Sequence, residues 1–117
     1  MPYALRSVAD LGMANLPEDE RTRWAQSLEG HVGADALLAM WRSTDIAESR
    51  PLLESTSCPA IVLAGELNLA IPVQWAARVA ERLPQGRLVD VKGAGGARGL
   101  THAAEARDAI LELMRAV

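Results

Sequence analysis

Aromatic residues are scarce in this chain of 117 residues, which has no phenylalanine, one tyrosine and three tryptophans. The apolar half of its composition therefore comes mostly from alanine, leucine and valine. A core of such small side chains is typical of helices that pack closely on a flat layer. The length favours one domain with one modest core.

Other features that are absent exclude whole classes of protein. The single cysteine excludes an internal disulfide, and no apolar run approaches the length that crosses a bilayer. Acidic and basic residues are interspersed around a net charge of -3, so no basic stripe offers a surface to nucleic acid. The N-terminal residues lack the pattern of a secretory signal. We therefore expect a cytoplasmic protein with neither a nucleic-acid nor a membrane partner.

The first half of the chain has a helical pattern. Ala4, Val8 and Leu11 are spaced as one face of an amphipathic helix. In "NLPEDERTRWAQSLEG", a proline and three acids suit the first turn of a helix, and a glycine ends it. "GADALLAMWRS" predicts a third, short helix. We expect residues 1–58 to form a helical, cap-like segment.

The second half, residues 59–117, predicts two strands that alternate with two helices. "AIVLAG" (60–65) has the length and apolar character of a buried strand, and "LVDV" predicts a second. "PVQWAARVAERL" and "THAAEARDAILELMRAV" predict the helices, with Thr101 as an N-cap. Two apolar stripes should be buried on these helices: Trp75, Val79 and Leu83 on the first, and Ala106, Ile110, Leu113 and Val117 on the second.

The predicted fold is therefore α/β, with a helical segment followed by a βαβα unit whose two strands are parallel. Two parallel strands leave both edges of the sheet open, and parallel sheets are normally extended sideways and covered on both faces. We expect oligomerisation to extend the sheet, through either a homodimer or a complementary chain.

Polar loops follow both predicted strands: "GELNLAIP" (65–72) and "KGAGGARGLTH" (92–102). Ligands and catalytic groups collect beyond the carboxyl ends of parallel strands, so both are candidate site loops. "CPAIVLAGELNLAIP" followed at this distance by "VKGAGGARGLTHAAEARDAILELM" resembles the C-terminal half of an α/β-hydrolase of the esterase, lactonase and haloperoxidase-like group. "DIAESRPLLESTSCP" resembles the end of that group's helical cap. The resemblance is clear over residues 51–117 and loose over 1–50.

The resemblance implies roles for two positions. In the family, the first loop has the form G-x-x-D-x-x-x-P and supplies the acid of a catalytic triad, and the second has the form G-x-G-H and supplies its histidine. This chain has Asn68 and Gly96 at these positions, and it contains no G-x-S-x-G nucleophile motif. An amide cannot carry the charge that stabilises an imidazolium, and glycine has no group that accepts a proton. Ordinary triad hydrolysis is therefore not expected.

Other polar residues are candidates for catalysis. Glu66 could act as a general base on water, although a solvated loop carboxylate is the simpler interpretation. His102 and His31 are further candidates, and for each an exposed imidazole at a helix end or in a loop is the simpler interpretation. Cys58 has no neighbouring base, so we expect a buried structural thiol. Two isolated histidines do not form a metal cluster, and we expect neither a metal nor a cofactor.

Three residues are candidates for ligand binding. Trp24 and Trp41 could line an apolar pocket beneath the cap or contribute to an oligomer interface. Arg98 lies beside the glycine-rich loop, which could bind an anion, although inherited turn geometry explains the same glycines.

Two functions remain open at this point. The first is a half domain without a triad that binds a partner chain or a small apolar ligand and is not catalytic. The second is a minimal hydrolase of small carboxylic esters or lactones, which would use Glu66, His102 or His31.

Overall fold

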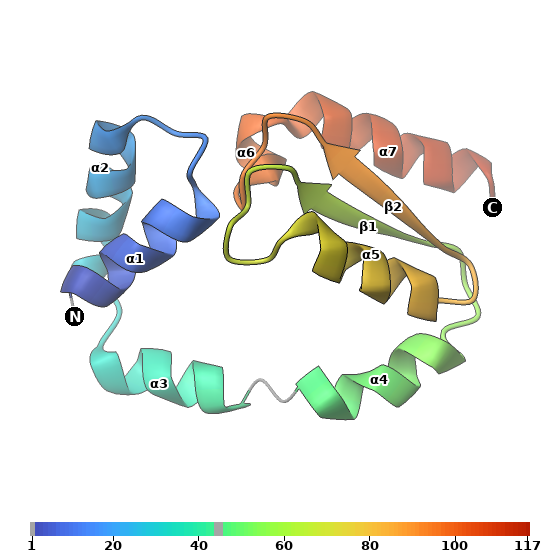
Figure 1. The fold of residues 1–117 in the computed structure, drawn as a ribbon, viewed down its shortest axis with the longest axis horizontal. Helices are drawn as coiled ribbons and strands as arrows, with labels where there is room; N and C mark the ends of the chain where they lie inside the picture. Colours follow the sequence, from blue (N-terminus) through green and yellow to red (C-terminus); the bar gives the residue numbers. More distant parts are fainter. Residues whose placement is uncertain (1, 44–45) are drawn as a thin grey trace.

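The computed structural model describes residues 2–43 and 46–117, without the side chains of residues 2–4, 41 and 46–48 (Figure 1). Helices form the first half of the chain, and a small sheet with its helices forms the second. In chain order the elements are α1 (Pro2–Gly12), α2 (Glu18–Glu29), α3 (Ala34–Ser43), α4 (Ile46–Ser55), β1 (Ala60–Gly65), α5 (Val73–Arg82), β2 (Gly86–Val91), α6 (Arg98–Thr101) and α7 (Ala103–Arg115).

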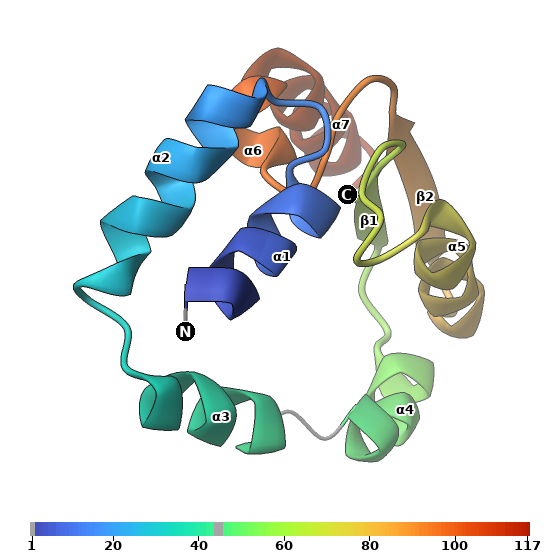
Figure 2. The same ribbon diagram turned by 60° about the vertical axis from the view of Figure 1, so that its left-hand side comes forward.

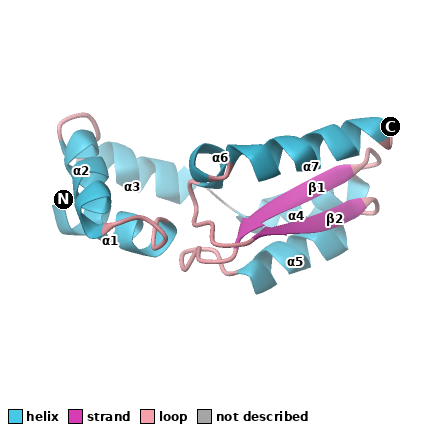
Figure 3. Cartoon of the chain, turned by 90° about the horizontal axis from the view of Figure 1, so that it is seen from above, coloured by secondary structure: helices cyan, strands magenta, loops and turns pink. Residues whose placement is uncertain are grey.

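The sheet consists of β1 and β2, which run parallel with Ala60 opposite Gly86 and Gly65 opposite Val91. Helix α5 makes the crossover between them, and Figure 3 shows α5 on one face of the sheet and α7 on the other. This arrangement confirms the predicted α/β class and the βαβα unit. The first strand has the predicted bounds, and the second begins two residues before the predicted one, at Gly86.

Helices α1 and α2 pack against each other around Leu5, Ala9 and Ala25, all nearly inaccessible to solvent. The predicted face of α1 was displaced by one position, because Leu5 and Ala9 are buried whereas Leu11 is 46% exposed. The position of α2 fixes this choice, since an amphipathic pattern indicates an apolar face but not what covers it.

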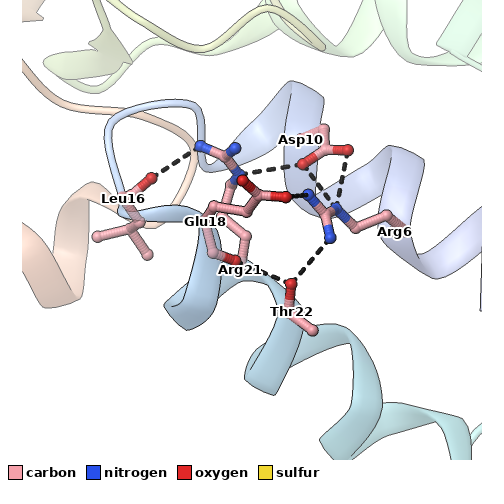
Figure 4. Close-up of polar contacts among 6 residues, drawn as sticks. All are labelled: Arg6, Asp10, Leu16, Glu18, Arg21 and Thr22. Carbon is pink, nitrogen blue, oxygen red and sulfur yellow. Dashed lines mark hydrogen bonds and ion pairs between the residues drawn. The ribbon is translucent and has the colours of Figure 1, made fainter.

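A cluster of charged side chains joins α1 to α2 (Figure 4). The carboxylate of Asp10 accepts hydrogen bonds from Nε of Arg6 at 2.9 Å and from Nε of Arg21 at 3.0 Å. Arg6 also donates to Oγ1 of Thr22 at 2.8 Å. The hydrogen bond from Arg6 is the main reason why the pKa of Asp10 lies below its ordinary value.

The apolar stripes predicted to be buried on the two sheet helices are largely exposed. Trp75 is 64% exposed on α5, where Ala76 and Ala80 are the residues that contact the core. On the terminal helix Ala106 is buried as predicted, but Ile110 is 47% and Val117 86% exposed. The described residues provide only two strands, so the small alanine side chains fill the contact with the sheet and the larger side chains extend beyond it.

The last helix also begins differently from the prediction. Thr101 ends the short helix α6, and α7 begins at Ala103 with His102 at the N-cap and no side-chain capping bond. No helix within the described ranges is long and apolar enough to cross a membrane.

Candidate functional site at the carboxyl ends of the strands

The loops after β1 and β2 are in close contact at one edge of the sheet. Leu67 N–H donates to the carbonyl of Ala94 at 2.8 Å, and Ala94 and Asn68 are both buried. A Cβ atom at Gly65 would stand 2.7 Å from the Ala94 carbonyl oxygen, so this approach requires glycine at position 65. The two loops therefore lie together and form one candidate site at the carboxyl ends of the parallel strands.

Asn68 is held rigidly in this site. Its Oδ1 atom accepts hydrogen bonds from the N–H groups of Ala70 at 3.1 Å and Ile71 at 3.2 Å, and the residue is 6% exposed. Its Nδ2 atom lies 3.5 Å from the point where a Cβ atom at Gly96 would stand. The two positions thus face each other, with an amide on one side and no side chain on the other.

The end of α1 covers this pair. The carbonyl of Leu11 accepts a hydrogen bond from Leu69 N–H at 2.9 Å, and the carbonyl of Gly12 accepts one from Gly96 N–H. A Cβ atom at Gly96 would stand 2.8 Å from that Gly12 oxygen, closer than real Cβ contacts come. Any side chain at position 96 would therefore require the end of α1 to move.

Asn15, in the turn after α1, also contacts the glycine-rich loop. Its Oδ1 atom is buried with no hydrogen-bond partner among the described residues, and it occupies the space that a Cβ atom at Gly95 would need. The consecutive glycines at 95 and 96 thus allow the segment between α1 and α2 to approach the loop. The sequence gives no pattern by which the roles of Gly12 and Asn15 could have been found, because this contact joins distant parts of the chain.

Glu66 is tied into the site by its neighbours. Its carboxylate accepts a hydrogen bond from Gly93 N–H at 2.9 Å and lies 3.3 Å from Nζ of Lys92, and these contacts, the first above all, lower its pKa. Lys92 also pairs with Asp90 at 2.7 Å, which raises the pKa of the lysine. A carboxylate with a lowered pKa is a weaker general base, so these partners make Glu66 less suited to activating water.

His102 lies beside the same turn as Glu66. Gly93 has a φ of 68°, and a Cβ atom there would stand 3.8 Å from Nε2 of His102. The Nδ1 atom of His102 lies 2.8 Å from Oγ1 of Thr101. Glu66 and His102 therefore both border Gly93, one through its hydrogen bond and the other through its ring.

The third catalytic candidate is located in another part of the molecule. His31 is exposed in the turn after α2, with its Nδ1 atom 2.7 Å from the carbonyl oxygen of Ser27. Cys58 is exposed rather than buried, because the segment before β1 runs over the surface. No group of three or more histidine, cysteine or acidic side chains within reach of one metal ion occurs in the described part of the chain.

The ligand-binding candidates lie in different places. Trp24 packs against the core of α1 and α2 that contains Leu5, Ala9 and Ala25. Arg98 lines an apolar hollow beside β1, together with Asn68 and Trp75, and donates to the Gly96 carbonyl at 3.2 Å. The side chain of Trp41 lies outside the described residues.

Comparisons with known proteins agree with this architecture. A family model described as TAP-like protein, of the α/β-hydrolases, matches residues 27–114. The crystal structure of a bromoperoxidase from Bacillus anthracis superposes with a TM-score of 0.79 at 16% sequence identity, and the match covers 97% of this chain and 44% of that one. No curated protein matches the chain.

The matched structure shows the fold alone at this level of identity, and the chain spans less than half of its length. The family model covers most of the chain, including both site loops. The resemblance inferred from the two loop motifs is thus confirmed, and the chain belongs to the TAP-like family of α/β-hydrolases.

Proposed function

We propose that this chain is a non-catalytic half domain of the α/β-hydrolase type, which acts by binding a partner chain. The observation that carries the proposal is that Asn68 and Gly96 face each other. The resemblance of the two loops assigns the family's acid and histidine to these two positions. A triad needs a carboxylate that stabilises an imidazolium and an imidazole that takes a proton from the nucleophile. An amide and a glycine supply neither function.

The contacts around the pair support the same proposal. The Gly12 carbonyl occupies the space into which a side chain at position 96 would extend. Hydrogen bonds from Gly96 and Leu69 to the end of α1 hold this arrangement in place. The site is therefore closed by backbone in the position from which an imidazole would have to act.

The proposal is tested with purified chain and a panel of p-nitrophenyl esters and small lactones. We expect no turnover above buffer, and none from the variant that carries both Asn68→Asp and Gly96→His, because the sequence contains no serine elbow. Saturable turnover by the wild-type chain would overturn the proposal.

Such turnover would favour the alternative function, a minimal hydrolase. One observation supports that alternative: Glu66 and His102 border the same glycine, Gly93. In that case Glu66→Gln and His102→Ala should each abolish activity. His31→Ala is the matched control, since this histidine lies in the turn after α2 and should leave the activity unchanged.

A further inference from the structure

In the described part of the chain, no strand pairs with the edge of β1 that faces away from β2. Ala60 N–H donates to the Gln85 carbonyl at 3.0 Å and Glu66 N–H to the Val91 carbonyl at 3.1 Å. Because hydrogen bonding alternates along a parallel strand, the N–H and C=O groups of Ile61 and Leu63 point to the opposite edge. The described sheet contains no strand there, and the elements that Figure 2 shows beyond β1, on the side away from β2, are helices.

The residue composition of the two strands indicates which edge of the sheet is suited to pair with a further strand. β2 carries Arg87 and Asp90, and charged side chains are the usual protection of an edge strand. The sequence of β1, AIVLAG, contains no charged residue. Such uncharged, apolar strands are typical of positions that are paired on both sides. An open edge on such a strand is a template for a further strand.

Two adjoining hollows, together called the groove, lie beside β1 and α5. The first, of about 450 Å³, is lined by Val62 to Ala64 and by Ile71, Trp75 and Val79. A second hollow of about 320 Å³ shares Trp75 and Val79 with the first and extends the groove towards Leu53. Ile71 is 57% and Trp75 64% exposed, so the groove presents apolar surface that water covers in the free chain.

The rim of the groove is positively charged. Arg98 lies at one end, and Arg50, Arg78 and Arg82 lie around the second hollow. Arg82 pairs with Glu54 at 3.1 Å, whereas none of the ion pairs between described residues involves Arg50, Arg78 or Arg98. Among the described residues, these three guanidinium groups have no carboxylate partner, and each can form an ion pair with an acidic group of a binding partner.

From this edge, groove and rim, we infer that β1 binds an extended strand of a partner protein that is apolar at its centre and acidic at its ends. Main-chain hydrogen bonds to Ile61 and Leu63 would supply the pairing, and the groove beside Trp75 would take alternate side chains. A second copy of this chain fits less well, because pairing through β1 would bring two arginine rims to one interface. The inference rests on the proposed function and specifies the chemistry of its partner.

The test uses three fluorescein-labelled peptides and the full chain, with fluorescence anisotropy as the measurement. The probe is Ac-EETVVVLEE-NH2; the charge control is Ac-KKTVVVLKK-NH2, and the pairing control is Ac-EETVPVLEE-NH2, whose proline cannot donate to a strand. We expect the acidic probe to bind at least tenfold more tightly than either control, with an affinity that falls as salt is added. Equal binding of all three peptides, or binding of none, would overturn the inference.

Substitutions in the chain locate the site. Arg78→Glu should weaken binding of the acidic probe about tenfold, a change of about 1.4 kcal/mol. Arg107→Glu is the matched control, because Arg107 is an exposed arginine of α7 that pairs with the adjacent Asp108 and does not line the groove. Equal losses of affinity in both variants would mean that the peptide responds to the net charge of the chain and does not bind in this groove. That result would also overturn the inference.

Sedimentation of the chain without peptide tests whether a second copy of the chain occupies the edge of β1 instead. A monomer that binds the probe supports the inference, whereas a stable dimer that excludes the probe would assign the edge of β1 to a second copy. Failure of the peptide assay with no ester turnover would leave the non-catalytic assignment intact. Ester turnover would overturn that assignment whatever the peptides do.

Discussion

Asn68 and Gly96 face each other, with Nδ2 of the asparagine 3.5 Å from the place of a Cβ atom on the glycine. Two loops that are well separated in sequence bring these positions together at the carboxyl ends of β1 and β2. These are the two positions to which the loop motifs assign the family's acid and histidine, and the proposal of a non-catalytic chain rests on the amide at one and the glycine at the other. The same geometry leads to specific expectations for stability.

Gly96→Ala should destabilise the chain. The added Cβ would meet the Gly12 carbonyl at 2.8 Å, and we expect the free energy of unfolding to fall by about 1–3 kcal/mol, as in other overpacked sites. Urea denaturation measures the change. Gly99→Ala is the control, since nothing lies within 4 Å of its added Cβ and the change should stay within about 0.5 kcal/mol. Equal stability of the two variants would contradict the observed contact with α1.

Asn68→Ala should also be costly, for a different reason. It leaves the N–H groups of Ala70 and Ile71 without their acceptor in a buried site, and we expect a loss of about 1–3 kcal/mol. Asn68→Asp keeps an oxygen acceptor for both groups and should lose less. The ranking is read from urea midpoints, and an alanine variant as stable as the wild type would show that these two bonds contribute nothing.

Acid should weaken the contact between α1 and α2 through Asp10. Because Arg6 and Arg21 lower the pKa of this carboxylate in the folded state, its contribution is present above the unfolded-state pKa. It is lost as the pH falls through the lowered folded-state pKa. We expect the gap in urea midpoint between wild type and Asp10→Asn to be largest near neutral pH and to close in acid, as the pH falls below the lowered folded-state pKa of Asp10.

The matched variant for this titration is Asp108→Asn, which removes an exposed carboxylate that pairs with its neighbour Arg107 on α7. Its midpoint should follow the wild type across the pH range, because exposed pairs of this kind contribute little. A gap for Asp10→Asn that is independent of pH would rule out titration of Asp10 as the cause.

Trp75 offers a direct comparison of sequence pattern with structure. A tryptophan in a buried stripe would cost about 3–5 kcal/mol on truncation, whereas one that is 64% exposed should tolerate Trp75→Gln within about 0.5 kcal/mol. Leu5→Ala is the reference for a buried side chain in this protein and should cost about 2–5 kcal/mol. A large loss for Trp75→Gln in the isolated chain would mean that the side chain is covered in solution, for instance by a second copy.

Local sequence was sufficient to predict the strand Ala60–Gly65, the helix that follows Pro72 and the parallel βαβα unit. Apolar run length, a proline at a helix start and the handedness of a crossover are local or nearly local constraints. For the same reason the sequence alone assigns the two candidate site loops, with Asn68 and Gly96, to one edge of the sheet.

Other features depend on contacts between distant segments, and there the sequence pattern was insufficient. Amphipathic spacing marked the apolar faces of α1, α5 and α7 but could not show whether a neighbour covers them, so Trp75 and Ile110 were wrongly expected in the core. The hydrogen bond from Gly96 to Gly12 and the ion pair of Glu66 with Lys92 also correspond to no pattern in the local sequence. Only the tertiary structure decides such contacts, because they depend on which surfaces the folded chain brings within reach of one another.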